Sequence, residues 1–249
     1  MILNRMNRLF LFFFLFIFEF IYSSAADAQS DGTDSAIYKK SIENVVDLYV
    51  NRLGENSNLY NGSEYIYSYH GIRGHPFFES DRLLNGEIEY DGILYKNVPM
   101  SYDLVRDEVF INEPGQNFNI KLVTEKIRYF SLSDRLFVRM LQDSMRNPSL
   151  TTGFYHVLYN GRVSVLARLT KKIQSGNAED SIKFVQYTNF WVKKDNEYQP
   201  VENKKTLLNI FGDQKDPVRK YLRKNKVNYK KDPAGAIIKA AEYYGSLKN

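Results

Sequence analysis

The chain has 249 residues, with 34 lysines and arginines against 29 aspartates and glutamates, and it contains no cysteine. This length suits one good-sized domain, or a domain with an appendage. The lack of cysteine excludes disulfide bonds, lipid attachment at a cysteine and cysteine nucleophiles. The fold must therefore be held together by its own core.

The N-terminus predicts a cleaved signal peptide. Arg5 and Arg8 precede an unbroken apolar run over residues 9–18, and residues 26–28 have the small-x-small form of a signal-peptidase site. The alternative is a transmembrane anchor, which needs about 20 apolar residues. Glu19 interrupts the run. We therefore expect an exported protein that is periplasmic, outer-membrane-associated or secreted, with no transmembrane span after cleavage.

The expected layout has four parts. They are a signal peptide (1–28), a flexible lead-in (29–34), a β-rich domain that opens with a helix (35–202) and a basic helical tail packed on the sheet (203–249). The opening helix is predicted from apolar residues at helical spacing that end at Gly54.

Residues 86–112 predict antiparallel hairpins with one apolar face. Asp91-Gly92 is a type I′ dipeptide, because both central residues of that turn need positive φ. A second turn is expected at Arg106-Asp107. The predicted opposite pairs are Tyr90 with Ile93, Ile88 with Tyr95, Glu87 with Lys96, Leu104 with Val109, and Tyr102 with Ile111. Because side chains alternate along a strand, these pairs place the large apolar residues on one face.

Further strands are expected over residues 64–69, 119–131, 135–141 and 182–193. Asn160-Gly161 predicts another type I′ hairpin. Its expected pairs are Leu158 with Val163, His156 with Val165, and Phe154 with Ala167. The fold class is thus α+β, mostly antiparallel β as a meander, a curled sheet or a half-barrel, with an N-terminal helix and a C-terminal helical tail.

The tail shows helix-start signals. Asp216-Pro217 and Asp232-Pro233 each combine an acidic N-cap with proline at the first helical position. Leu207, Leu208 and Phe211 fit a shorter helix that ends at Gly212.

One glycine-rich loop holds the best candidates for chemistry. The candidate residues are His70, Arg73, His75, Glu79 and Asp81. Two histidines with nearby acids could serve hydrolysis, but no complete metal-ligand or catalytic motif is present. His156 falls on an apolar hairpin face, where a histidine is usually a core or boundary residue. We assign no catalytic residue, metal site or cofactor.

The tail is strongly basic. Residues 203–231 carry ten lysines and arginines against two aspartates. The candidates for contact with an anionic surface are Lys204, Lys205, Arg219, Lys220, Arg223, Lys224 and Lys226. A solvated face of amphipathic helices is the alternative. Nucleic acid is not an expected partner of an exported protein.

Five stretches, residues 59–65, 74–78, 90–102, 153–163 and 203–228, are distributed over most of the length of the chain after the signal peptide. They resemble a group of uncharacterised exported proteins from Gram-negative bacteria. The resemblance implies export and a β-rich fold, and it transfers no catalytic residue. We expect a non-enzymatic binding or scaffold protein of the cell envelope, with an apolar small molecule or an anionic envelope surface as partner. The alternatives are a hydrolase of envelope glycan or peptide and a binder of anionic membranes through the basic tail.

Overall fold

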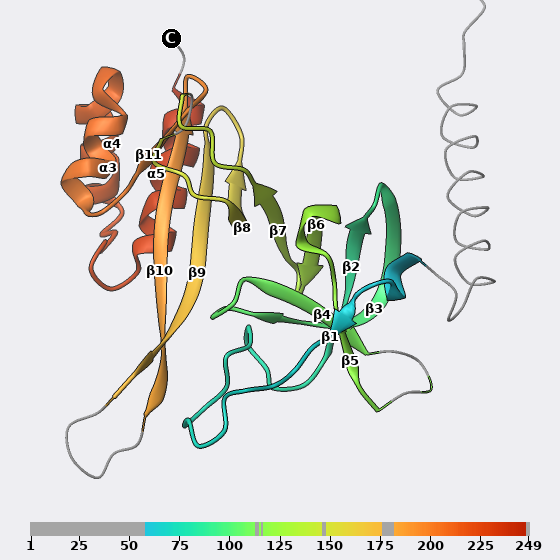
Figure 1. Cartoon of the computed structure of the whole chain (residues 1–249). Helices are drawn as coiled ribbons and strands as arrows, with labels where there is room; N and C mark the ends of the chain where they lie inside the picture. Colours follow the sequence, from blue (N-terminus) through green and yellow to red (C-terminus); the bar gives the residue numbers. More distant parts are fainter. Residues whose placement is uncertain (1–57, 113–114, 116, 146–147, 176–181, 248–249) are drawn as a thin grey trace, which may run out of the picture. The chain divides into compact units, whose positions relative to one another are not determined.

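The computed structural model describes residues 58–112, 115, 117–145, 148–175 and 182–247 (Figure 1). The predicted signal peptide, lead-in and opening helix lie outside the described residues. Within the described part, none of the helices has both the length and the apolar character that a membrane span requires.

One antiparallel sheet organises the described residues (Figure 1). Its order is β1-β5-β4-β3-β2-β6-β7-β8-β9-β10-β11. The strands are β1 (Ser63–Glu64), β2 (Leu84–Tyr90), β3 (Ile93–Asp103), β4 (Glu108–Asn112), β5 (Asn119–Lys121), β6 (Ile127–Leu132), β7 (Arg135–Met140), β8 (Gly153–Asn160), β9 (Ser164–Gln174), β10 (Lys183–Lys194) and β11 (Glu197–Pro200). The predicted α+β class, with mostly antiparallel strands, is confirmed.

The sheet is open, with β1 and β11 at its two ends. The prediction of a curled sheet or half-barrel is therefore wrong. The physical reason is that helices cover the apolar face of β8, β9 and β10. A sheet that is covered in this way buries its apolar side chains without folding over itself.

The β2–β3 hairpin keeps most of its predicted register. Asp91 and Gly92 have φ of 53° and 80°, as a type I′ turn requires. Ile88 pairs with Tyr95, and both side chains are buried. The predicted pairing of Glu87 is wrong, because the register shifts between Gly86 and Ile88. A β-bulge of this kind adds a residue to one strand and displaces its neighbours.

The β3–β4 register differs from the prediction by two residues. Tyr102 pairs with Val109 rather than with Ile111, and Leu104 lies in the turn. The Asp103 carboxylate accepts hydrogen bonds from the backbone N–H groups of Val105 (2.8 Å) and Arg106 (3.1 Å). This side-chain acceptor closes a longer turn than the dipeptide signal predicts. A shift of two residues leaves each side chain on its predicted face.

The Asn160-Gly161 prediction is wrong in register. His156 pairs with Ala167 and Asn160 with Ser164, with a bulge between Val157 and Tyr159. Neither residue of the dipeptide adopts positive φ. The connection is longer, because the buried Val163 belongs to the turn and its carbonyl accepts a hydrogen bond from the Gly161 N–H.

Three α-helices follow the sheet: α3 (Lys204–Ile210), α4 (Lys215–Lys224) and α5 (Pro233–Ser246). Single 3-10 turns are η2 (Asn58–Tyr60), η3 (Thr124–Lys126) and η4 (Gly212–Gln214). The Asp232 N-cap is confirmed, since its carboxylate accepts from the Gly235 N–H at 2.8 Å. The predicted Asp216 N-cap is wrong, because α4 begins at Lys215, two residues before the predicted first helical residue, Pro217.

The helices pack on the β8–β10 region of the sheet. Val163, Val165 and Val192 lie in one buried cluster with apolar residues of α3, α4 and α5. Polar contacts support this docking. The Lys194 Nζ on β10 lies 2.8 Å from the Asp213 carboxylate, which also accepts from the Tyr244 hydroxyl at 3.0 Å.

Candidate functional site

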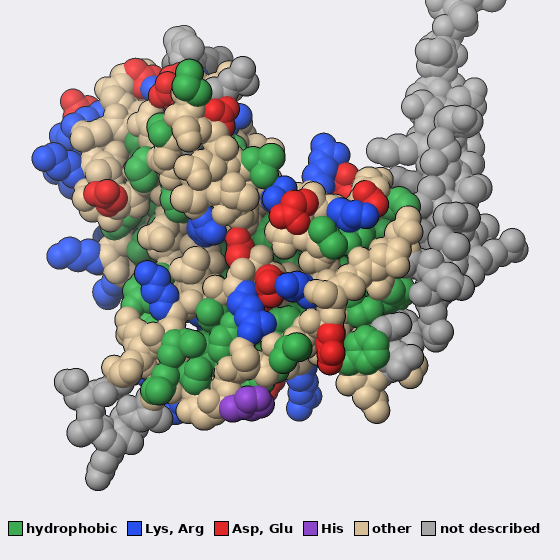
Figure 2. Space-filling model, in the orientation of Figure 1, with side chains coloured by type: hydrophobic (Ala, Val, Ile, Leu, Met, Phe, Trp, Pro, Cys, Tyr) green, Lys and Arg blue, Asp and Glu red, His purple; other side chains and the backbone are tan. Residues whose placement is uncertain are grey.

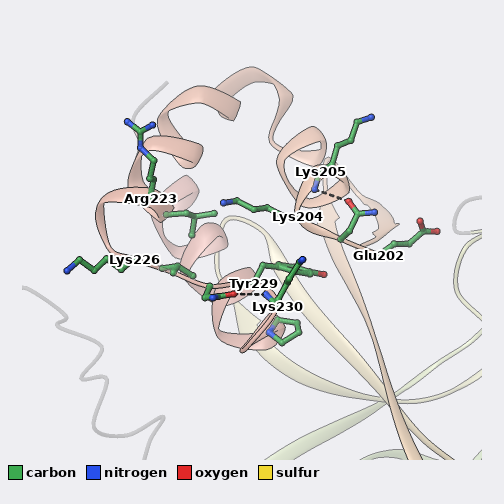
Figure 3. Close-up of a pocket in the computed structure, with 12 residues that line it drawn as sticks. Glu202, Lys204, Lys205, Arg223, Lys226, Tyr229 and Lys230 are labelled. Atoms are coloured by element: carbon green, nitrogen blue, oxygen red, sulfur yellow. Dashed lines mark hydrogen bonds between the residues drawn. The ribbon is translucent and has the colours of Figure 1, made fainter.

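A cavity of about 890 Å³ lies between the start of α3, the end of α4 and the loop that leads to α5 (Figure 3). Its exposed basic side chains are Lys204, Lys205, Arg223, Lys226 and Lys230. Its more buried apolar residues are Leu222, Val227, Tyr229 and Pro233. Glu202 is the acidic residue in the lining. We call this cavity the basic pocket.

A capping box sets one wall of the basic pocket. The Asn203 carboxamide oxygen accepts hydrogen bonds from the backbone N–H groups of Lys205 and Thr206, and the Thr206 hydroxyl accepts from the Asn203 N–H at 3.0 Å. This reciprocal cap fixes where α3 begins. Lys204 therefore stands in the first turn, and Figure 3 shows its side chain extending toward α4.

The end of α4 sets the opposite wall. Lys226 has a φ of 53°, in the left-handed region that a helix C-terminus usually fills with glycine. Its N–H donates to the Arg223 carbonyl, and the Val227 N–H donates to the Leu222 carbonyl at 2.9 Å. The chain thereby reverses. Val227 and Tyr229 belong to the apolar lining, which we call the floor of the cavity. In Figure 3 the side chains of Arg223 and Lys226 extend outward from this end of α4.

The basic pocket is electrostatically unbalanced. In the part of the chain that the structure describes, none of its five basic side chains forms an ion pair. Arg219, on α4 but outside the pocket, instead lies 3.0 Å from the Asp216 carboxylate. Figure 2 shows lysine and arginine side chains projecting over α3 and α4. Such an arrangement attracts anions.

The seven basic residues singled out in the sequence divide into two groups. Lys204, Lys205, Arg223 and Lys226 line the basic pocket. Lys220, Lys224 and Arg219 lie on α4 outside its lining. Lys230 and the apolar floor were missed. Lys230 belongs to the same basic run, whereas the floor depends on how α4 and the following loop pack.

No family model, curated protein or solved structure matches this chain. Its function must therefore be inferred from its own chemistry. The basic pocket offers ammonium and guanidinium donors above an apolar floor, and the burial of Tyr229 raises the pKa of that phenol. These groups suit the binding of carboxylates, phosphates or sulfates.

The candidate catalytic residues of the glycine-rich loop each contact a different partner. His70 is exposed and contacts the Tyr67 ring edge-to-face, with 5.5 Å between centroids. Arg73 is hydrogen-bonded through its backbone N–H to the Ile182 carbonyl. His75 is half-buried and stacks on Phe77. Burial lowers the pKa of His75, and the nearby Lys171 ammonium lowers it further.

Glu79 pairs with an arginine of the sheet. Its carboxylate lies 2.7 Å from the Arg135 guanidinium, and its charge also acts on His156, which contacts Phe137. Burial lowers the pKa of His156 to about 4, and the Arg135 charge acts in the same direction. His156 is therefore neutral at pH 7. Asp81 is exposed. Among the described residues, no group of three or more His, Asp or Glu side chains is placed to hold a metal ion.

A buried carboxylate that the sequence did not indicate lies under the loop. Asp103 is fully buried and accepts hydrogen bonds from the hydroxyls of Tyr65 (2.8 Å) and Tyr69 (3.1 Å). The Arg106 guanidinium lies over both rings. Burial, with Asp103 as hydrogen-bond acceptor, raises the pKa of Tyr65 far above its usual value. These tyrosines therefore remain hydroxyl donors at neutral pH.

Proposed function

We propose that this protein is a non-enzymatic, exported binding protein of the bacterial cell envelope, and that its basic pocket binds an anionic ligand. The observation that carries the proposal is the set of five basic side chains that surround an apolar floor and form no ion pair with any described residue. Each lysine or arginine near an anionic surface contributes about 1 kcal/mol to binding.

The concave placement of these charges supports binding over a merely solvated helix face. On an ordinary helix surface, basic residues pair with neighbouring acids, as Arg219 does with Asp216. In the basic pocket, three separate segments contribute lysine or arginine to one cavity. Export is supported by the signal-peptide pattern at Arg5 and residues 9–18.

The competing hydrolase hypothesis needs a histidine and a carboxylate that converge on one cleft. His70 contacts Tyr67, His75 contacts Phe77, and Glu79 pairs with Arg135. Neither His70 nor His75 lines the basic pocket. The binding hypothesis is therefore supported by a cavity that the described residues form and that these two histidines do not line.

Two matched double variants test the proposal. Lys204→Gln with Lys226→Gln removes two charges from the pocket, whereas Lys220→Gln with Lys224→Gln removes two charges from α4 outside it. Binding of polyphosphate, of polyglutamate and of vesicles with or without phosphatidylglycerol is measured for each. We expect the pocket variant to lose about 2 kcal/mol, or roughly thirtyfold in Kd, for the anionic probe that binds.

The control variant should retain most of its affinity. Equal losses in both variants would mean that diffuse charge attracts the probes, and the pocket proposal would be wrong. Vesicle binding without binding of the soluble polyanions would identify a membrane headgroup as the anion. Binding of the soluble probes would identify a free ligand.

A further inference from the structure

Among the described residues, strand β10 has a long edge to which no other strand is paired. It pairs with β9 from Lys183 to Lys193, but on its other side β11 covers only Trp191 to Lys194 (Figure 1). Beyond β11, Val201 donates its N–H to the Phe190 carbonyl, and Arg73 bridges to the far end of β10. Residues 185–189 lie between these two contacts.

The backbone groups that face this edge follow from the observed hydrogen bonds. The Ile182 carbonyl accepts from Arg73, the Phe184 N–H donates to Arg73, and the Phe190 carbonyl accepts from Val201. Orientation alternates along a strand, so even-numbered residues of β10 face the same way. Gln186 and Thr188 therefore direct both N–H and C=O toward this edge. Within the described residues, no backbone hydrogen bond from another segment reaches them there.

The edge also lacks the usual protection against pairing. Natural sheet edges carry charged residues, prolines or bulges that block the addition of another strand. Residues 185–189 read Val-Gln-Tyr-Thr-Asn, with neither charge nor proline. The β9–β10 register runs through them without a shift. A regular, uncharged edge of this kind is a template for an extended partner chain.

The edge continues into the basic pocket. A second cavity, of about 340 Å³, is lined by Thr188, Asn189 and other residues at the point where β11 ends. Glu202, Tyr229 and Pro233 line both cavities. A polypeptide that pairs with the edge of β10 would therefore extend into the basic pocket, among its lysines and arginines.

We propose that the ligand is an extended, acidic polypeptide segment that adds to the sheet beside β10. Its backbone pairs with Gln186 and Thr188, and its carboxylates lie among the basic side chains of the pocket. A segment that adds antiparallel to β10 runs in the same direction as β11. Its N-terminal end is the acidic one and lies in the basic pocket. Charge complementarity with the lysines and arginines of the basic pocket selects an acidic chain. This inference rests on the proposed function of the basic pocket.

Alternate N-methylation of the ligand backbone tests strand addition. The probe is a labelled synthetic peptide with a block of glutamates followed by alternating threonine and valine, and its binding is followed by fluorescence anisotropy. Two versions carry N-methyl groups on alternate residues of the Thr-Val segment, in opposite phase. One phase removes the N–H groups that pair with β10, and the other removes those that point away. We expect one version to bind at least about tenfold more weakly and the other to bind like the parent peptide.

The protein side provides a second measurement. Thr188→Pro removes the outward N–H, whereas Thr188→Val keeps it and changes only the exposed side chain. We expect Thr188→Val to bind the peptide normally and Thr188→Pro to bind it weakly. Circular dichroism of both variants verifies the fold, and the N-methylated peptides decide the matter if Thr188→Pro misfolds.

Several outcomes would overturn the inference. They are equal binding of both N-methylated versions, absence of peptide binding, and a β10-dependent dimer in analytical ultracentrifugation, which would make a second copy the occupant. The proposed function is tested separately by polyphosphate and vesicle binding. The pocket variant could lose polyphosphate or vesicle binding while both N-methylated peptides bind equally well. That result would support anion binding by the basic pocket and would exclude strand addition at β10.

Discussion

The Tyr65 hydroxyl donates a 2.8 Å hydrogen bond to the Asp103 carboxylate, which lies 38 residues further along the chain. The same carboxylate closes the β3–β4 turn through the N–H groups of Val105 and Arg106. The Asp103 side chain therefore stabilises both the β3–β4 turn and the segment that precedes the glycine-rich loop.

Asp103→Ala should lower the free energy of unfolding by about 3 kcal/mol, because several buried donors lose their acceptor at once. Urea denaturation measures the loss. Asp216→Ala is the control, since its ion pair with Arg219 is exposed and should be worth less than about 1 kcal/mol. Similar stability of the two variants would contradict the structural role of Asp103.

Gly153→Ala should be destabilising by about 2 kcal/mol or more. Gly153 has a φ of 151°, and a Cβ there would collide with the Asp107 carboxylate and with the Arg168 guanidinium, which form an ion pair. Gly212→Ala is the matched control, since a Cβ at that position meets nothing within 4 Å. Thermal unfolding of the two variants checks the difference. Equal melting temperatures would show that the Asp107 and Arg168 side chains move aside to admit the Cβ without a loss of stability.

The stability of the protein should fall between pH 6.5 and pH 4. The pKa of His156 is about 4 in the folded protein, against an ordinary 6.5. In that pH range the unfolded chain therefore binds more protons at this residue, which favours unfolding as the pH falls. His156→Phe should show a weaker dependence in urea titrations at pH 7 and pH 5. An NMR titration midpoint near 6.5 for His156 would contradict this account.

Lys226→Gly should separate stability from binding. Glycine adopts the left-handed conformation of Lys226 without strain, so the variant should gain about 1 kcal/mol in unfolding free energy. It should also bind polyanions more weakly, because the basic pocket loses a charge. Lys226→Ala is the control that loses the charge without relieving the strain. If Lys226→Gly kept full affinity, the pocket would not need this lysine.

Local turn chemistry predicted part of the fold. The Ile88–Tyr95 pair followed from Asp91-Gly92, whose residues meet the dihedral demands of the turn without outside help. The β3–β4 turn was misjudged, because the carboxylate of Asp103 caps it while also binding distant tyrosines. A dipeptide signal contains no information on such contacts.

The helix starts give the same lesson. Asp232 and Asp216 each precede proline, yet only the carboxylate of Asp232 caps a helix. For α4, the preceding 3-10 turn runs directly into the helix and moves its start to Lys215. In the candidate site, charge alone identified Lys204 and Lys226. The cavity between them depends on the packing of α3 against α4, which the local sequence does not specify.

The order of the strands bears on how the chain is assembled during synthesis. Strands β2 and β6 are neighbours in the middle of the sheet. The half that contains β1 to β5 is complete once β5 has been synthesised, whereas the half from β6 to β11 grows one strand at a time toward the C-terminus. The helices that shield Val163, Val165 and Val192 are made last. A nascent chain halted before Asn203 would therefore present these valines to the surrounding water, as a surface that chaperones recognise.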